Sequence, residues 1–130
     1  MRIDFRQWGV FNAVGLGGFV VQLGAIGLLT RYFGWPAFTA TAVGLELAAL
    51  QNFLAHSRWT WADRRVTGWR AWVRRYARYQ AAKTTALLAN LAITSLLTHA
   101  GAPPEIANTA AVLACAIPNY LFSERLVFGS

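Results

Sequence analysis

Residues 7–30 read QWGVFNAVGLGGFVVQLGAIGLLT, a run of 24 residues without a charged side chain. The hydrocarbon core of a bilayer is about 30 Å thick, and roughly 20 helical residues are needed to cross it. A lone strand would leave its backbone polar groups unpaired in lipid, so a helix is the form available to such a segment. The run therefore predicts a transmembrane helix over about residues 9–30.

Three further stretches repeat this pattern. Residues 32–57 contain one charge, Glu46, and residues 84–104 and 106–123 contain none. The composition agrees, because 56% of the 130 residues are hydrophobic and only 13% are charged, about half the charged share of a soluble domain. A soluble fold could not bury so much apolar surface, which argues against a soluble enzyme. We therefore expect an all-α integral membrane protein with four transmembrane helices, near residues 9–30, 37–56, 79–98 and 105–123.

The basic residues set the expected orientation. The chain carries twelve Lys or Arg against five Asp or Glu, a net charge of +7. In a four-helix topology, eleven of the twelve fall on one side of the membrane and Arg31 alone falls on the other. The positive-inside rule then places both termini and the central loop in the cytoplasm. Topology accounts for most of the charge, so no nucleic-acid partner is needed to explain it.

The chain partly matches itself after a shift of 67 residues. Asn52-Phe-Leu-Ala-His-Ser-Arg58 aligns with Asn119-Tyr-Leu-Phe-Ser-Glu-Arg125, and Gly34-x-Pro36 aligns with Gly101-x-Pro103. This doubled pattern predicts two helical hairpins that enter the membrane from the same side, as parallel repeats. We expect a single transmembrane domain over residues 1–130, with one repeat over about 6–61, a cytoplasmic linker and interfacial segment over about 62–77, and a second repeat over about 75–128.

The segment between the repeats is strongly amphipathic. Residues 66–83 read VTGWRAWVRRYARYQAAK, in which aromatic residues and arginines each recur at helical spacing. This pattern favours a helix lying at the cytoplasmic interface. It serves either as an anchor, with aromatic rings at headgroup depth, or as a site that also holds an anionic lipid headgroup.

Chemistry of the soluble-enzyme type is not visible in the sequence. His56 and His99 have no Cys or carboxylate neighbours at metal-ligand spacing. No Ser-His-Asp order, Gly-rich phosphate loop or paired carboxylate stands out. We therefore expect no enzyme activity, no metal and no cofactor.

The glycines of the first span allow close helix approach, which serves packing within the chain or a homo-oligomer contact.

Three polar residues fall at comparable depth in the predicted spans: Glu46, Gln22 and Asn90. An ionisable side chain inside a membrane is costly and usually faces the interior or a wet cavity. Glu46 is either a structural residue that hydrogen-bonds to a neighbour such as Gln22 or Asn90, or a functional group that contacts a headgroup or carries a proton. Its repeat-related residue is Leu113, so any such site would be asymmetric.

The motifs resemble those of the GtrA-like family of small four-helix bacterial membrane proteins. The resemblance rests on Asn52-Phe with Arg58-Trp-Thr-Trp61, on Arg75-Tyr-Ala-Arg78-Tyr, and on Asn119-Tyr with Arg125-Leu-Val-Phe128. It covers nearly the whole chain. It implies a multi-pass protein of the bacterial inner membrane that translocates a polyprenyl-phosphate-linked sugar from the cytoplasmic to the outer leaflet, for cell-surface polysaccharide synthesis. The implied partner is a membrane glycosyltransferase.

The basic residues at the expected cytoplasmic face are compatible with that ligand, because Arg binds phosphate through two parallel hydrogen bonds while Lys acts as a point charge. Asn52 and Asn119 are candidates for hydrogen bonds to the phosphate or sugar, or for contacts between helices. Trp59 is a candidate for stacking on the lipid-linked sugar, or for the interfacial belt. The candidate phosphate-binding residues are Arg58, Arg75, Arg78, Lys83 and Arg125. Two other functions stay open: a non-transporting accessory subunit that recruits a glycosyltransferase, and a small proton-coupled exporter.

Overall fold

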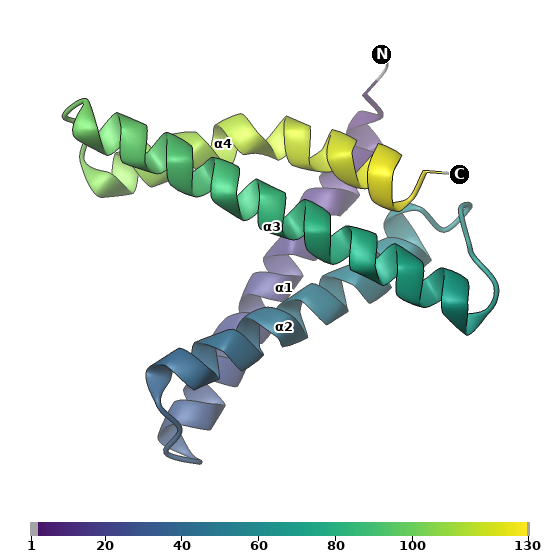
Figure 1. Cartoon of the computed structure of the whole chain (residues 1–130), viewed down its shortest axis with the longest axis horizontal. Coiled ribbons are helices and arrows are strands. Elements are labelled where there is room, and N and C mark those ends of the chain that lie inside the picture. Colours follow the sequence, from purple (N-terminus) through teal and green to yellow (C-terminus); the bar gives the residue numbers. More distant parts are fainter. Residues whose placement is uncertain (1–2, 130) are drawn as a thin grey trace. The chain divides into compact units, whose positions relative to one another are not determined.

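The computed structural model describes residues 3–129, and every regular element within them is helical. The chain divides between Arg65 and Val66 into two compact units, each built around a pair of helices joined by a short turn (Figure 1). The first unit contains α1 (Phe5–Arg31), α2 (Ala37–Ala55) and a π-helical turn, η1 (His56–Thr60). The second contains α3 (Trp69–His99), α4 (Pro104–Phe122) and the π-helical turn η2 (Ser123–Val127).

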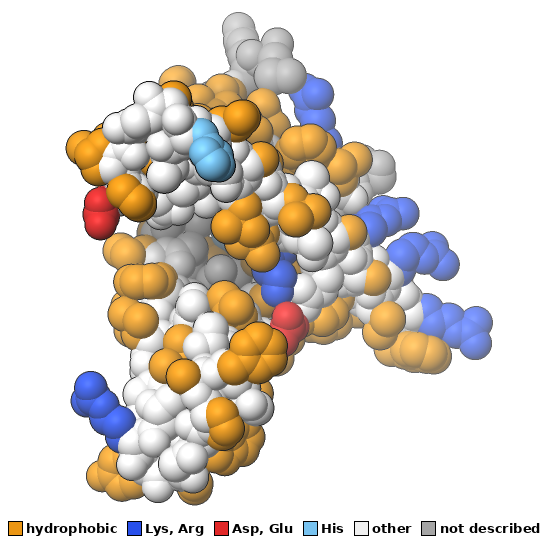
Figure 2. All heavy atoms as spheres, turned by 60° about the vertical axis from the view of Figure 1, so that its left-hand side comes forward, with side chains coloured by type: hydrophobic (Ala, Val, Ile, Leu, Met, Phe, Trp, Pro, Cys, Tyr) orange, Lys and Arg blue, Asp and Glu red, His pale blue; other side chains and the backbone are white. Residues whose placement is uncertain are grey.

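Length and composition identify the protein as a membrane protein. Three helical segments among the described residues are long and apolar enough to cross a bilayer: Phe5–Arg31, Ala37–Thr60 and Pro104–Val127. Most of their large apolar side chains are exposed, and Figure 2 shows hydrophobic side chains spread over the helix surfaces. Such exposure would be unfavourable in water but is the natural state of helices surrounded by lipid tails. The predicted all-α membrane class is confirmed.

The third helix departs from the prediction. We expected a span near 79–98 preceded by a separate interfacial segment, but α3 is one helix over Trp69–His99. No Gly or Pro interrupts these 31 residues, so nothing in the sequence breaks the backbone hydrogen bonding. At 1.5 Å per residue the helix is about 46 Å long. The α3 helix is not among the segments that meet the apolar criterion, since its first turns carry arginines and its apolar part contains Asn90.

The turns inside the two hairpins have the same local geometry. Gly34 and Gly101 have φ angles of 65° and 103°, a conformation that favours glycine. Pro36 and Pro103 then cap α2 and α4, and their carbonyl oxygens accept bonds of 3.0 Å and 2.9 Å from the amides four residues later. The Gly-x-Pro motif thus makes the chain leave one helix and begin the next in both units.

The ends of the hairpins also correspond. The wide turn η1 closes with a 2.9 Å bond from the Trp61 amide to the His56 carbonyl, and η2 closes with a 3.0 Å bond from Phe128 to Ser123. Each turn directs its final aromatic ring inward, so Trp61 and Phe128 are both 0% exposed. The same turns leave Arg58 and Arg125 exposed. In both units the five-residue turn of the repeated motif therefore places an aromatic ring in the interior and an arginine on the surface.

Candidate functional site

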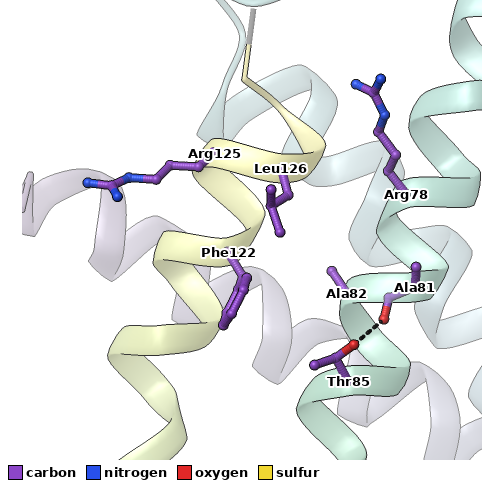
Figure 3. Close-up of a pocket in the computed structure, with 7 residues that line it drawn as sticks. All are labelled: Arg78, Ala81, Ala82, Thr85, Phe122, Arg125 and Leu126. Carbon is purple, nitrogen blue, oxygen red and sulfur yellow. Dashed lines mark hydrogen bonds between the residues drawn. The ribbon is translucent and has the colours of Figure 1, made fainter.

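A pocket of about 520 Å³ lies within the second unit, between α3 and the end of the α4–η2 segment (Figure 3). Its α3 wall follows helical spacing, since positions 78, 81, 82 and 85 share one face of a helix. Its other wall comes from the last residue of α4 and from η2. The lining residues are Arg78, Ala81, Ala82, Thr85, Phe122, Arg125 and Leu126.

Two arginines stand at this pocket, one from each wall. Arg78 and Arg125 are both exposed, and neither forms an ion pair with any residue between 3 and 129. In Figure 3 the Arg125 guanidinium points away from α3, and the Arg78 side chain extends beyond the pocket. Both side chains are long and exposed, so their charges can reach an anion that enters between the walls. The sequence predicted both residues, and the structure places them at one pocket.

The remaining lining is apolar apart from one hydroxyl. Ala81, Ala82, Phe122 and Leu126 supply the walls, and Thr85 lies about two helical turns from Arg78. The Thr85 hydroxyl donates a 2.9 Å hydrogen bond to the Ala81 carbonyl, drawn dashed in Figure 3. Its oxygen keeps lone pairs that can accept from a ligand. The arrangement suits an amphiphilic anion, with charge at the arginines and an apolar part along the walls.

Arg75 has a different environment from Arg78. It is only 8% exposed, and its Cζ lies 5.2 Å from the centre of the Phe128 ring. Guanidinium over an aromatic face is a favourable cation–π geometry. This arginine packs against the end of its own hairpin and does not line the pocket. Lys83 is half-buried on α3 and does not line the pocket either.

The corresponding end of the first unit is filled by aromatic packing. The Phe11 and His56 rings stack with centroids 4.7 Å apart, and the Phe11 and Trp61 rings meet edge-on at 5.9 Å. His56 Nδ1 lies 2.9 Å from Thr60 Oγ1, and Gln7 Nε2 donates to the Thr60 carbonyl at 2.8 Å. This cluster was not foreseen from the sequence, where His56 had been considered only as a metal ligand.

Two predicted residues follow this cluster on the surface. Arg58 and Trp59 belong to η1, and both are exposed. Neither lines the pocket of the second unit. Their exposure is compatible with interfacial positions, where Trp and Arg are common.

The two repeat-related asparagines are half-buried on α2 and α4. Asn52 lies against Gly18 of α1, where an added Cβ would overlap the Asn52 amide group. Its Oδ1 atom is buried, and no hydrogen-bond donor reaches it from the residues that the structure describes. In the repeat alignment Asn119 corresponds to Asn52, and Thr85 corresponds to Gly18. Asn52 therefore marks the close contact of α1 with α2.

The three polar residues predicted at mid-depth lie on three different helices. Glu46 is exposed on α2, and Gln22 is half-buried on α1. Asn90, on α3, accepts a 3.2 Å hydrogen bond from Asn108 Nδ2, which also lies 3.4 Å from Thr94 Oγ1. This polar contact joins α3 to α4 within the second hairpin. In the sequence, Asn108 interrupts an apolar run. Because polar side chains in membrane helices hydrogen-bond across helices, its pairing with another Asn was predictable.

The described residues contain no group of three or more His, Cys, Asp or Glu that could hold a metal ion. Cys115 is buried in α4 as a free thiol. The pocket therefore derives its chemistry from two guanidinium groups, one hydroxyl and apolar walls.

A family model for the GtrA/DPMS transmembrane domain matches residues 10–128. The chain belongs to this family. The match spans both hairpins of this GtrA/DPMS chain, and it confirms the resemblance inferred from the doubled Asn-to-Arg motif. No curated protein sequence matches the chain significantly.

The sequence predicted the two arginines that line this pocket, but it did not predict the residues that form its apolar walls. Ala81, Ala82 and Thr85 recur with Arg78 at helical spacing, a signal that was available once α3 was known to be continuous. Phe122 and Leu126 were hidden because their spacing depends on the wide η2 turn. A π-helical turn has no reliable sequence signature, and such turns are frequent at functional sites.

Proposed function

We propose that this GtrA/DPMS protein translocates a polyprenyl-phosphate-linked sugar from the cytoplasmic to the outer leaflet, for cell-surface polysaccharide synthesis or modification. The observation that carries the proposal is the pair of exposed arginines, Arg78 and Arg125, at one apolar-walled pocket. A phosphate between them would receive charge-assisted hydrogen bonds, the strongest kind available to it. The family match supports the same class of substrate.

The proposed topology has four crossings as two parallel hairpins, with both termini on the cytoplasmic side of the bacterial inner membrane. Its support is the charge distribution, with eleven of twelve basic residues on one side. About 20 residues in the second part of α3 are long enough to span the core. The earlier turns of α3 would then project toward the cytoplasm, with Arg78 at the boundary and the apolar walls of the pocket just inside the cytoplasmic leaflet. That end is where a lipid-linked sugar is made, so the pocket would meet its substrate there.

Transport, rather than covalent catalysis, is the activity that these residues favour. Arginine guanidinium groups stay protonated and bind phosphate without acting as acids or bases. Thr85 is the hydroxyl at the pocket, and its proton is already donated to the Ala81 carbonyl. Binding and movement of an intact phosphoester need no acid, base or nucleophile, so they fit the side chains that line the pocket.

Reconstitution in liposomes tests the proposal. Polyprenyl-phosphate hexose is distributed over both leaflets, and a membrane-impermeant reagent that oxidises the sugar is added outside. With active protein, the inner-leaflet half should become accessible on the timescale of the assay. Accessibility limited to the outer half, with correctly folded protein in the vesicles, would refute the translocation function.

A second function has support from the exposed surface of α3. Trp69 and Val73 are exposed in its first turns, and the Arg70 guanidinium lies 5.6 Å from the centre of the Trp69 ring. Exposed aromatic and arginine side chains are typical of protein interfaces. An accessory subunit that recruits a membrane glycosyltransferase would use such a surface. Co-purification of the transferase that is lost in Trp69→Ala, with translocation absent in the wild type, would favour this function.

A further inference from the structure

The two hairpins share a sequence pattern but differ in the size of the residues at two corresponding positions of their helices. Gly18 and Gly44 line the contact between α1 and α2, where an added Cβ at Gly44 would lie 3.1 Å from the Gln22 carbonyl oxygen. In the repeat alignment the second hairpin has Thr85 and Ala111 at these positions. Small residues allow close approach of helices in lipid, and added side-chain atoms hold helices apart. The second hairpin therefore has larger residues than the first at these two corresponding positions.

Three positions that line the pocket have packed or buried counterparts in the first hairpin. Position 78 of the pocket corresponds to Phe11, whose ring stacks on His56. Position 85 corresponds to Gly18, which is buried against Asn52. The place of Phe122 is taken by Ala55, which is also buried. The first hairpin therefore has a packed aromatic ring in place of one arginine, and buried residues at two other positions of the pocket lining.

The open pocket has a polar rim and an apolar interior. Thr85 lies seven residues beyond Arg78 on α3, about 10 Å along the helix axis. Between these levels the walls are alanine, phenylalanine and leucine side chains. A volume of about 520 Å³ falls within the range of small-molecule sites. Phosphate at the arginines and a hydrocarbon chain along the walls would satisfy both parts of the surface.

We propose that the second hairpin alone holds the substrate, as one phosphoester lipid per chain, with its phosphate between Arg78 and Arg125 and its first apolar units against Ala82, Phe122 and Leu126. The first hairpin is the closed counterpart that supports the fold. This assignment rests on the proposed function for the identity of the ligand. It adds that the site is asymmetric, although the repeats that build the protein are alike.

Binding by the purified full chain in detergent tests the assignment separately from transport. The probe is geranylgeranyl phosphate, and native mass spectrometry gives both its affinity and its stoichiometry. Geranylgeraniol, which lacks the phosphate, and inorganic phosphate, which lacks the chain, show which part is recognised. We expect one geranylgeranyl phosphate per chain and much weaker binding of the other two.

Substitutions locate the site. Arg78→Gln and Arg125→Gln should each weaken geranylgeranyl phosphate binding by about tenfold or more, since each removes a charge-assisted hydrogen bond. Arg74→Gln is the matched control, because Arg74 is exposed one turn earlier on α3 and does not line the pocket. Ala81→Leu should also weaken binding by filling the pocket, whereas Ala77→Leu adds the same bulk outside it.

The repeat-related substitution decides the asymmetry. Arg58→Gln should leave the affinity for geranylgeranyl phosphate within about twofold of the wild type, since the first hairpin has Phe11, stacked on His56, where the pocket has Arg78. Two bound lipids per chain, or equal losses in Arg58→Gln and Arg125→Gln, would overturn the assignment. If inorganic phosphate alone binds as tightly, the site is one for a free anion and the assignment is wrong. Single-site lipid binding without transbilayer movement would instead leave the assignment standing and remove the translocation function.

Discussion

The close contact between α1 and α2 makes a quantitative prediction about Gly18. A methyl group at this position would overlap the amide of Asn52, so the end of that side chain would have to move aside. Overpacking costs about 1–3 kcal/mol, and the lower end applies where the obstructing side chain can move. Gly24 lies on the same helix with no atom within 4 Å of an added Cβ. Both substitutions by Ala gain the same helix propensity, about 0.5–1 kcal/mol, so this gain cancels when they are compared.

Gly18→Ala should therefore be less stable than Gly24→Ala by about 1 kcal/mol, the lower end of the cost of overpacking. The measurement is the unfolding midpoint in detergent micelles, followed by tryptophan fluorescence. In the Asn52→Ala protein, the further substitution Gly18→Ala should cost little stability, because the side chain that obstructs the added methyl group is then absent. Equal midpoints for Gly18→Ala and Gly24→Ala would refute the close packing of the first hairpin.

Two other contacts give measurable expectations. Phe128→Ala empties a fully buried site and removes the ring beneath Arg75. The free energy of unfolding should therefore fall by about 3–5 kcal/mol. Leu113→Ala is the control, because Leu113 is 70% exposed and its truncation should change the unfolding midpoint little. Asn108→Ala breaks the bond to Asn90, and a double-mutant cycle on this pair should give a coupling of about 0.6 kcal/mol and at most about 1.7 kcal/mol. A coupling of zero would show that the two side chains do not interact in the folded protein.

The fold class was predictable because charge and hydropathy act over whole segments. The starts and ends of α1, α2 and α4 lie within four residues of the predicted limits, since charged residues or Gly-x-Pro turns flank each apolar run. The start of α3 was missed by ten residues, at Trp69 rather than 79. Its arginines look like a boundary by hydropathy, yet arginine is a good helix former and nothing stops the helix there.

The candidate site was only partly predictable, for a related reason. Charge patterning singled out Arg78 and Arg125, but the cavity between them depends on how far α3 stands from α4. The residues at corresponding positions differ between the repeats, with Thr85 and Ala111 where the first hairpin has Gly18 and Gly44. The repeat made the halves look equivalent, and a few atoms at the helix contacts make them different. Arg75 illustrates the same limit, since its burial against Phe128 depends on the η2 turn.

The central claim is that a phosphoester lipid crosses the membrane after binding at the arginines of the second hairpin. The most direct measurement compares the wild type with the double variant Arg78→Gln/Arg125→Gln in liposomes that contain polyprenyl-phosphate hexose. The account predicts that the impermeant reagent reaches the whole lipid pool with the wild type and only the outer half with the double variant. Full access with the double variant, or access to only the outer half with both proteins, would contradict it.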